Sequence, residues 1–387
     1  MTATGILNFT KQEKMVFGFP ASDALLDQVT TGGHNRVFIT TNRSLSASEL
    51  ISEITCKLGD RCVGIYSEIS AHSPQEAVLE ATSEARAAKA DVIVGVGGGS
   101  VIDATKVVLG CLWDNVSDVT GLDQLAQDGP KNSKAPNAIR MISIPTTLSA
   151  AEFTPLAGIT DRSTQTKRLF LDPLYTPACV IFDPEATLSA PQWLFLSTGI
   201  RGVDHCVETW LSSRPSAYGD ALSREGLRRI TPALRAVHAD PKNLDARLEC
   251  QLATFLAISG PVGGVPVGAS HGIGRVLGGA FNVAHGHTSC ALLPAVLDWN
   301  SAEDDGRQKD VVTLMGADSG TTASQAVAAL VSDLDLPGTL QDLDIRRDQF
   351  DLIVDRSLVM LADGTTSGNQ RAVTSGDQIL EILERAY

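Results

Sequence analysis

Residues 90–109 read ADVIVGVGGGSVIDATKVVL, and this stretch decides the fold. It begins with a continuous apolar run over residues 92–94, which is typical of a strand covered on both faces. The run then turns on four small residues, Gly97, Gly98, Gly99 and Ser100. Glycines let a backbone approach an anion closely, and the first N–H groups of the following helix point towards it. The stretch therefore predicts a phosphate-binding strand–turn–helix, although three glycines also occur in plain tight turns.

The chain around this stretch alternates between strand and helix patterns. Strands are predicted over residues 36–40, 62–66 and 140–144, with helices over 48–58 and from residue 74. Alternation of this kind predicts a parallel sheet with helices on both faces, and ligands of such sheets lie beyond the carboxyl ends of the strands. Thr146 and Thr147 follow the strand at 140–144, so we expect them at the same edge as the glycine turn.

The pattern changes near Pro184, where long helical repeats take over and continue to Tyr387. We therefore expect two domains. Residues 1–184 form a Rossmann-like α/β domain with a parallel sheet, and residues 185–387 form an all-helical domain. At 387 residues, the chain is long enough for two cores.

Composition narrows the classes of partner. The formal net charge of −14 argues against nucleic acid and anionic membranes, because their phosphates would be repelled. The seven cysteines contain no CxxC pair, so they predict reduced thiols in a cytoplasmic protein. The N-terminal residues show no signal-peptide pattern, and no apolar run approaches the length of a membrane span.

A second group of candidate residues lies in the helical half. Arg201, His205 and Glu208 share one face of a predicted helix, whereas Asp204 points about 100° away by the helical repeat. Three further histidines follow in two short stretches: His271, His285 and His287. Each histidine alone is more often a surface or core residue than a ligand. Together they predict a site for zinc or ferrous iron that could polarise a carbonyl oxygen.

Several short motifs occur in a characteristic order. They are Gly97-Gly98-Gly99-Ser100 with Asp103 and Lys106, then Pro145-Thr146-Thr147, Asp183-Pro184, His205 with Glu208, His271, and His285-Gly286. This order resembles that of the iron-containing alcohol dehydrogenase superfamily over essentially the whole chain. The resemblance implies a Rossmann-like N-terminal domain, a helical C-terminal domain and a homodimer.

The same resemblance implies a cofactor, NAD(H) or NADP(H), bound at the glycine turn. Its pyrophosphate would lie against the glycines and Ser100, with Asp103 in the same motif. Residues matching Thr146, Thr147 and Lys167 would lie along the cofactor. Histidines matching His205, His271 and His285 are ligands of a divalent metal in the family.

Arg201 departs from the family pattern. Family members that hold iron or zinc carry an aspartate ligand four residues before the first histidine, and a guanidinium has no lone pair to offer a metal. Maleylacetate reductases also lack this aspartate, and the stretch from Thr146 to Asp161 resembles that branch. Arg201 is therefore predicted to bind a substrate carboxylate or an oxyanion. The alternative is an ion pair with Glu208 or Asp204 that only braces the helix.

These residues predict hydride transfer between a nicotinamide and a small-molecule alcohol or carbonyl carbon. His271, His285 or His287 would relay the proton, with Arg201 and His205 beside them. Asn42 stands where many NAD-preferring relatives carry an aspartate, and Arg43 could attract a 2′-phosphate, so we expect either cofactor to be usable. The function best predicted is a maleylacetate reductase-like reductase of a keto acid. The alternatives are a metal-dependent alcohol dehydrogenase, a dehydroquinate synthase-like lyase and an inactive nucleotide-binding scaffold.

Overall fold

The computed structural model describes residues 7, 9–71, 73–135, 138–161, 166–362 and 364–387. Contacts between Cα atoms divide the chain into two compact units. One unit runs from Thr10 to Ala190, and the other comprises Pro191–Tyr387 with the described residues Leu7 and Phe9.

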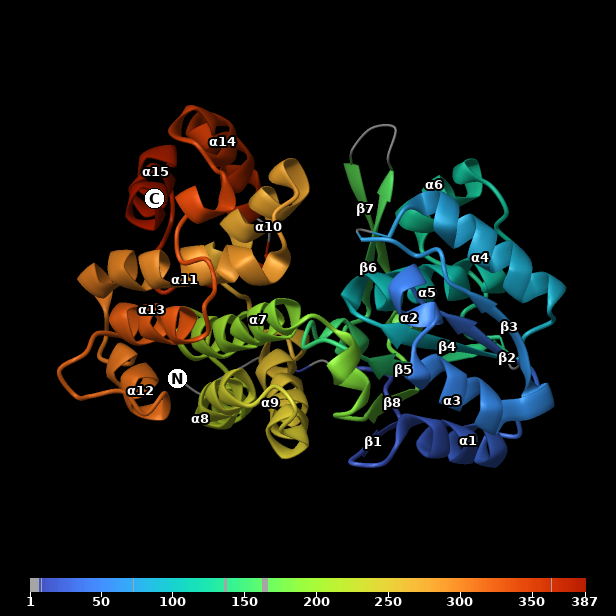
Figure 1. Ribbon diagram of the computed structural model, residues 1–387. Coiled ribbons are helices and arrows are strands. Elements are labelled where there is room, and N and C mark those ends of the chain that lie inside the picture. Colours follow the sequence, from blue (N-terminus) through green and yellow to red (C-terminus); the bar gives the residue numbers. More distant parts are fainter. Residues whose placement is uncertain (1–6, 8, 72, 136–137, 162–165, 363) are drawn as a thin grey trace. The chain divides into compact units, whose positions relative to one another are not determined.

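The first unit is built on a six-stranded parallel sheet (Figure 1). The strand order is β1-β8-β5-β4-β2-β3. The strands are β1 (Lys14–Phe17), β2 (Val37–Thr40), β3 (Cys62–Tyr66), β4 (Val92–Gly97), β5 (Arg140–Pro145) and β8 (Cys179–Phe182). A separate antiparallel hairpin pairs β6 (Leu156–Asp161) with β7 (Thr166–Leu171). The chain leaves β2 towards β3 but leaves β4 towards β5, so the direction of winding reverses between β2 and β4, where doubly wound sheets bind ligands.

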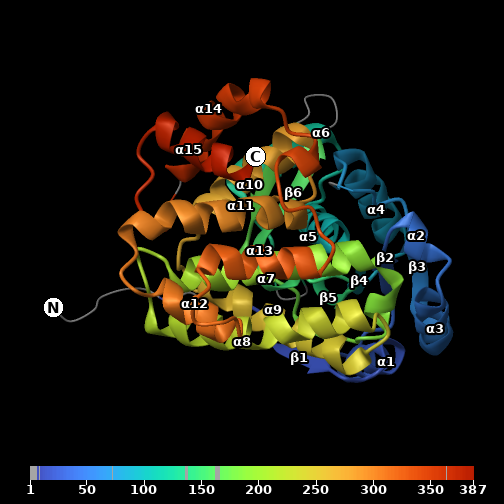
Figure 2. The ribbon, with the colours of Figure 1, turned by 60° about the vertical axis from the view of Figure 1, so that its left-hand side comes forward.

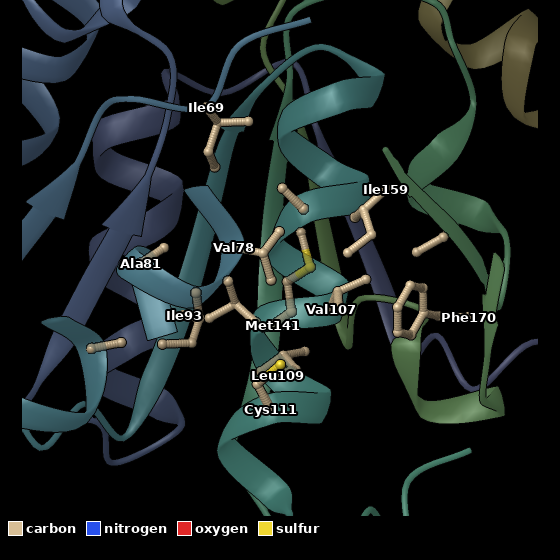
Figure 3. Close-up of a cluster of buried hydrophobic side chains, with 14 of the residues drawn as sticks. Ile69, Val78, Ala81, Ile93, Val107, Leu109, Cys111, Met141, Ile159 and Phe170 are labelled. Carbon is tan, nitrogen blue, oxygen red and sulfur yellow. The ribbon is translucent and has the colours of Figure 1, made fainter. Parts of the chain in front are cut away.

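Helices cover both faces of this sheet. They are α1 (Ala21–Thr31), α2 (Arg43–Ser46), α3 (Glu49–Leu58), α4 (Gln75–Ala87), α5 (Gly99–Trp113) and α6 (Val119–Asp128). One core lies between the sheet and α1 and α3, and the other lies under α4 and α5. Figure 3 shows the second core, in which Val107 and Leu109 of α5 lie near Ile93 of β4 and Met141 of β5. The predicted Rossmann-like α/β fold is confirmed.

The second unit contains only helices among its described residues. They are α7 (Gln192–Trp210), α8 (Ala217–Ala239), α9 (Leu244–Val262), α10 (Ala269–Phe281), α11 (His285–Asn300), α12 (Gln308–Leu314), α13 (Ala323–Asp333), α14 (Phe350–Leu361) and α15 (Gly376–Ala386), with short 3₁₀ turns between some of them. Helix α11 packs against α7, α10, α13 and α15, and Figure 2 shows it running between α13 and α15. Its Trp299 is buried in the hydrophobic core of this unit.

All seven cysteines are free thiols. Within the described part of the chain, none of the helices combines the length and apolarity needed to cross a membrane.

Candidate functional site

The glycine turn joins β4 to α5 at the reversal point of the sheet. Gly97 ends β4 with φ +153°, a conformation that L side chains rarely adopt, and Gly98 is the residue before the first turn of α5. No side chain caps this helix start in the described structure. A Cβ on Gly98 would lie 3.2 Å from Thr147 Cγ2, so the missing side chain keeps the turn open. An uncapped helix start behind small residues is the arrangement that binds phosphate groups.

Two threonines from the end of β5 complete this edge. The backbone N–H of Thr146 donates to the Gly97 carbonyl oxygen at 3.1 Å, which places the two strand ends side by side. Thr147 is buried, and its Oγ1 has no hydrogen-bond partner among the described residues. Because a buried hydroxyl is normally bonded, Thr147 has capacity for a ligand atom beside the glycines. The residues of this turn therefore fit the diphosphate of a dinucleotide.

Asn42 lies at the end of β2, next to β4 in the sheet. Thr41 Oγ1 donates to the Val96 carbonyl oxygen at 2.9 Å, which ties this strand end to β4. The Asn42 Oδ1 atom caps α2, because it accepts hydrogen bonds from Leu45 N at 2.9 Å and Ser44 Oγ at 2.7 Å. The Asn42 side chain is neutral. This position therefore lacks the acidic group that would repel a 2′-phosphate.

The neighbouring Arg43 forms an exposed ion pair with Glu68, which follows β3. The guanidinium that was expected to attract a 2′-phosphate therefore already has an anionic partner.

Asp103 and Lys106 hold the chain segment that follows Thr147. Asp103 Oδ2 accepts a hydrogen bond from Gly158 N at 3.1 Å. Lys106 is fully buried, and its Nζ donates to the carbonyl oxygens of Ala151, Thr154 and Leu156 at 2.6, 2.8 and 2.8 Å. Both side chains thus form hydrogen bonds to backbone groups of the same unit. Contact of Asp103 with the cofactor stays a prediction. Lys167 lies in β7, but its side chain is outside the described residues.

Glu152 is a buried carboxyl group that the sequence did not single out. Neither of its oxygens has a hydrogen-bond partner in the described part of the chain. Burial raises the pKa of Glu152 to about 7, although the Lys106 charge opposes this rise. Burial lowers the pKa of Lys106 to about 8, with Asp103 and Glu152 opposing. Burial therefore shifts both Glu152 and Lys106 towards their neutral forms.

In the second unit, Glu208 of α7 organises the start of α10. Its Oε2 accepts from Gly268 N at 2.7 Å, and its Oε1 accepts from Ser270 N at 2.8 Å. The His271 Nδ1 atom lies 2.8 Å from the same Oε2. A carboxylate at a helix N-terminus is favoured by the helix dipole and satisfies otherwise unpaired N–H groups. Glu208 therefore fixes both the helix start and the orientation of the His271 ring.

Asp204 joins the same network. Its Oδ2 accepts from Ser270 Oγ at 2.8 Å and Ser289 Oγ at 2.6 Å, and lies 3.3 Å from His271 Nδ1. Burial alone would raise the pKa of Asp204, but His271, Arg201 and these hydrogen bonds outweigh it and lower the pKa. Asp204 lies on a different face of α7 from Arg201, His205 and Glu208. It still belongs to the same site, because Ser270 of α10 and Ser289 of α11 donate hydrogen bonds to it.

Arg201 lies beside this network with its side chain 14% exposed. Its Nη1 donates to Ser289 Oγ at 3.2 Å and lies 4.0 Å from Asp204 Oδ2. Burial lowers the pKa of Arg201, and the Asp204 carboxylate opposes this shift. The ion pair with Asp204, which the sequence left open as an alternative role, exists only as this long contact.

Two of the predicted histidines meet. The rings of His205 and His271 have centroids 4.6 Å apart. His205 Nδ1 and His271 Nε2 are buried and have no hydrogen-bond partner in the described structure. Burial, followed by the charges of His271 and Arg201, holds the pKa of His205 well below its usual value. His205 is therefore neutral near pH 7.

The other two histidines lie at the start of α11. The exposed His285 ring lies against Gly278 of α10, where an added Cβ would be 2.6 Å from His285 Cε1. The His287 ring packs against Trp193 with centroids 5.1 Å apart, and burial lowers the pKa of His287. The structure thus brings His205 and His271 together, while the roles of His285 and His287 stay predictions.

The donor set does not fit a divalent metal as the resemblance implies. Three potential ligands with atoms within 4.8 Å of one another are found in the described structure: Asp204, Glu208 and His271. Their facing atoms already share hydrogen bonds with Ser270, Ser289, Gly268 and one another. Arg201 occupies the position of the family's aspartate ligand, and its cation would repel a metal. Three buried atoms of this site, Asp204 Oδ1, His205 Nδ1 and His271 Nε2, nevertheless have no hydrogen-bond partner in the described structure.

The serines of this network were missed in the sequence. Ser270 and Ser289 lie 66 and 85 residues from Asp204 along the chain. Ser270 directly precedes His271, and that adjacency was the only available signal.

Comparisons with known proteins identify the family. The model of the iron-containing alcohol dehydrogenase family matches residues 12–184, and its C-terminal counterpart matches residues 195–387. The dehydrogenase FUM7 of Gibberella moniliformis is 34% identical over 88% of this chain and 89% of its own length. Maleylacetate reductase of Burkholderia cepacia is 30% identical over 97% of this chain and 95% of its own length.

A crystal structure of 1,3-propanediol oxidoreductase has the same fold. It superimposes with a TM-score of 0.88 at 23% identity, covering 99% of this chain and 100% of that one.

Proposed function

The chain belongs to the iron-containing alcohol dehydrogenase family and is a dehydrogenase or reductase, and within this class we propose that it reduces a keto acid with NAD(P)H, as maleylacetate reductases do. The observation that carries the proposal is Arg201, which stands at the position of the family's aspartate ligand. Its guanidinium donates to Ser289, which is bonded to Asp204, and Asp204 lies 3.3 Å from His271 Nδ1. Family membership leaves no support for the lyase alternative.

The glycine turn would hold the dinucleotide. The family uses NAD(P), and the bound cofactor supplies the hydride. The open turn at Gly98, the uncapped start of α5 and the unpaired Thr147 hydroxyl would bind its diphosphate. NADH and NADPH are both expected to serve.

The side chains of α7 and α10 would bind the keto acid. Arg201 would hold a carboxylate or the developing oxyanion, because a guanidinium offers a planar fork of N–H donors. The His271 Nδ1 atom carries hydrogen, since the Glu208 carboxylate beside it only accepts. Reduction of a carbonyl needs a proton for the substrate oxygen, and His271 Nε2, which has no partner in the described structure, would take this proton from solvent and pass it on.

The test is oxidation of NADH and of NADPH with maleylacetate, lactaldehyde and acetone, each with chelator and with added iron or zinc. We expect maleylacetate to be the best substrate and the chelator to leave its rate unchanged. The Arg201→Ala variant should lose about a hundredfold in kcat/KM for maleylacetate, because a charged hydrogen bond is lost, and far less for acetone. Equal losses with both substrates would contradict a carboxylate role for Arg201.

A metal-dependent alcohol dehydrogenase is the second candidate. It is favoured by the buried ring nitrogens of His205 and His271 that have no partner within the described residues. Loss of activity with chelator and recovery with iron or zinc would establish it in place of the first. A homodimer also stays a prediction, and sedimentation would test it.

A further inference from the structure

The segment that follows Thr147 forms a wall of the glycine turn. A Cβ on Gly99 would lie 3.0 Å from Ser149 Oγ and 3.8 Å from Ala151 Cβ, so this segment contacts the first residue of α5. Ala150, between those two residues, has a left-handed backbone with φ +60°. An alanine keeps this conformation only where surrounding contacts hold it. The wall therefore depends on contacts that fix it against the helix start at which the diphosphate is proposed to bind.

Lys106 supplies such contacts. Its Nζ donates to three backbone carbonyl oxygens of the segment, at 2.6, 2.8 and 2.8 Å. Carbonyl oxygens only accept, so three such bonds need the three hydrogens of an ammonium group. Burial lowers the pKa of Lys106 to about 8, but these bonds favour its charged form. Lys106 therefore carries its charge at neutral pH and ties the segment to α5.

Glu152 lies in the same segment, but its carboxyl group takes no part in these bonds. The side chain is fully buried, and neither carboxyl oxygen has a hydrogen-bond partner in the described structure. The charges that act on it are those of Lys106 and Asp103 on α5, whereas the next residue, Phe153, packs against Phe182 of β8. Burial raises the pKa of Glu152 to about 7, so this carboxyl group gains and loses a proton in the neutral range.

A bound dinucleotide would bring two negative charges close to this carboxyl group. Glu152 directly follows Ala151, which contacts the glycine turn, so its carboxyl group lies on the order of 10 Å from a diphosphate held there. At that distance two like charges would favour the neutral carboxyl over the carboxylate by about tenfold. The diphosphate would therefore raise the pKa of Glu152 further, and the protein would take up a proton as the dinucleotide binds.

We propose that Glu152 couples dinucleotide binding to the uptake of a proton from solvent, so that the glycine turn holds the diphosphate most tightly while this carboxyl group is neutral. The inference rests on the dinucleotide site of the proposed function and deepens it, because it adds a pH dependence to the binding step that precedes hydride transfer. Glu152 acts through its charge from behind the wall of the turn and is not a catalytic residue. The alternative is that Glu152 only fills space beside α5, in which case its ionisation and dinucleotide binding are independent.

The test is calorimetric titration of the full chain with NADH at several pH values, in buffers of different ionisation heat, which gives both the affinity and the number of protons taken up. NADH is the probe because the 2′-phosphate of NADPH itself titrates near pH 6. The wild type should take up about half a proton per NADH near pH 7.5, and its affinity should fall about tenfold as the pH rises from about 6 to about 9. Glu152→Gln stays neutral and should lose both effects. Glu84→Gln, in which an exposed residue of α4 changes, is the matched control and should keep both.

Unchanged proton uptake in a folded Glu152→Gln variant, or a wild type that binds NADH without proton uptake near pH 7.5, would overturn the inference. The second result needs no variant, and circular dichroism establishes whether Glu152→Gln is folded. Because binding requires no turnover, the two proposals fail separately. Linked proton uptake without reduction of maleylacetate would contradict the proposed function alone. Reduction of maleylacetate by a chain that binds NADH without proton uptake would contradict the coupling alone.

Discussion

The glycine turn of the first unit and the start of α10 in the second unit differ in whether their polar groups have hydrogen-bond partners within the protein. At the glycine turn the helix start has no side-chain cap, and the Thr147 hydroxyl has no partner among the described residues. At the start of α10, Glu208 and Asn369 accept the first N–H groups of the helix, and Asp204 accepts two serine hydroxyls. One helix start has no side-chain cap in the described structure, and the other is closed by the protein itself.

The difference teaches that the same feature, a helix N-terminus near glycine, has two uses. An open start binds an external anion, and changes there should affect ligand affinity more than stability. A start closed by a buried carboxylate holds the fold and orients His271, so changes there should affect stability first. Each of the following predictions would either break this contrast or make it sharper.

The largest effect is expected for Glu208→Ala. This change leaves Gly268 N and Ser270 N without their acceptor and removes the partner of His271 Nδ1. Loss of one member of a buried charged network costs about 3–5 kcal/mol, so urea unfolding should show a decrease of that size. Glu384→Ala is the control, because Glu384 forms only an exposed pair with Arg347 and should cost less than about 1 kcal/mol. A variant as stable as this control would show that α10 does not depend on Glu208.

A pH effect of about 3 kcal/mol is expected from Glu152. Its folded pKa of about 7 lies above the ordinary value of 4.5, so the fold favours the neutral carboxyl. This contribution to stability is complete below pH 4.5 and is lost as the pH rises through 7. Glu152→Gln stays neutral, so the free energy of unfolding of the wild type relative to this variant should fall across that window.

Urea unfolding at several pH values between 4 and 8 measures the Glu152 effect, with Glu84→Gln, an exposed residue of α4, as the control. The result bears on the contrast because Glu152, like Thr147 at the glycine turn, is a buried polar group without a hydrogen-bond partner in the described structure. A difference between wild type and Glu152→Gln that does not change with pH would mean that Glu152 is compensated inside the fold.

Gly98→Val tests the open turn. The new side chain would occupy the space between the turn and Thr147, where a Cβ already comes within 3.2 Å of Thr147 Cγ2. Dinucleotide affinity, followed by the fluorescence of bound NADH or NADPH, should fall about a hundredfold because charged hydrogen bonds to the diphosphate are lost. Stability should change much less than in Glu208→Ala. Gly320→Val, with nothing within 4 Å of its added Cβ, is the matched control. If Gly98→Val binds dinucleotide normally, the diphosphate does not lie at this turn.

The smallest effect is expected for Glu68→Gln. This change removes the exposed partner of Arg43 next to Asn42, so that Arg43 becomes available to a 2′-phosphate. Because exposed ion pairs are weak, we expect the affinity for NADPH relative to NADH to rise only about threefold to fivefold. The ratio should not move in Arg43→Ala/Glu68→Gln, which lacks the cation. An equal rise in that double variant would assign the effect to Glu68 rather than to Arg43.

Local sequence patterns predicted the fold well because each pattern acts over a few residues. The apolar run of β4, the three glycines and the start of α5 are consecutive, so their geometry follows from backbone preferences alone. The α7 helix was predicted for the same reason, including the shared face of Arg201 and His205. Helical spacing does not say which helices pack against a given face. The contact of Asp204 with Ser270 and Ser289, which lie in other helices, was therefore not predicted.

The sequence by itself determined the alternation of strands and helices, the glycine turn between β4 and α5 and the unusual cation at position 201, because all three depend on residue type and short spacing. Only the tertiary structure decided which groups Arg201 meets. Ser289 reaches it from α11, a helix distant along the chain, and Gly274 of α10 leaves the space in which its guanidinium lies. Side chains that meet across helices depend on how those helices pack, and packing is a property of the whole folded unit rather than of any one segment.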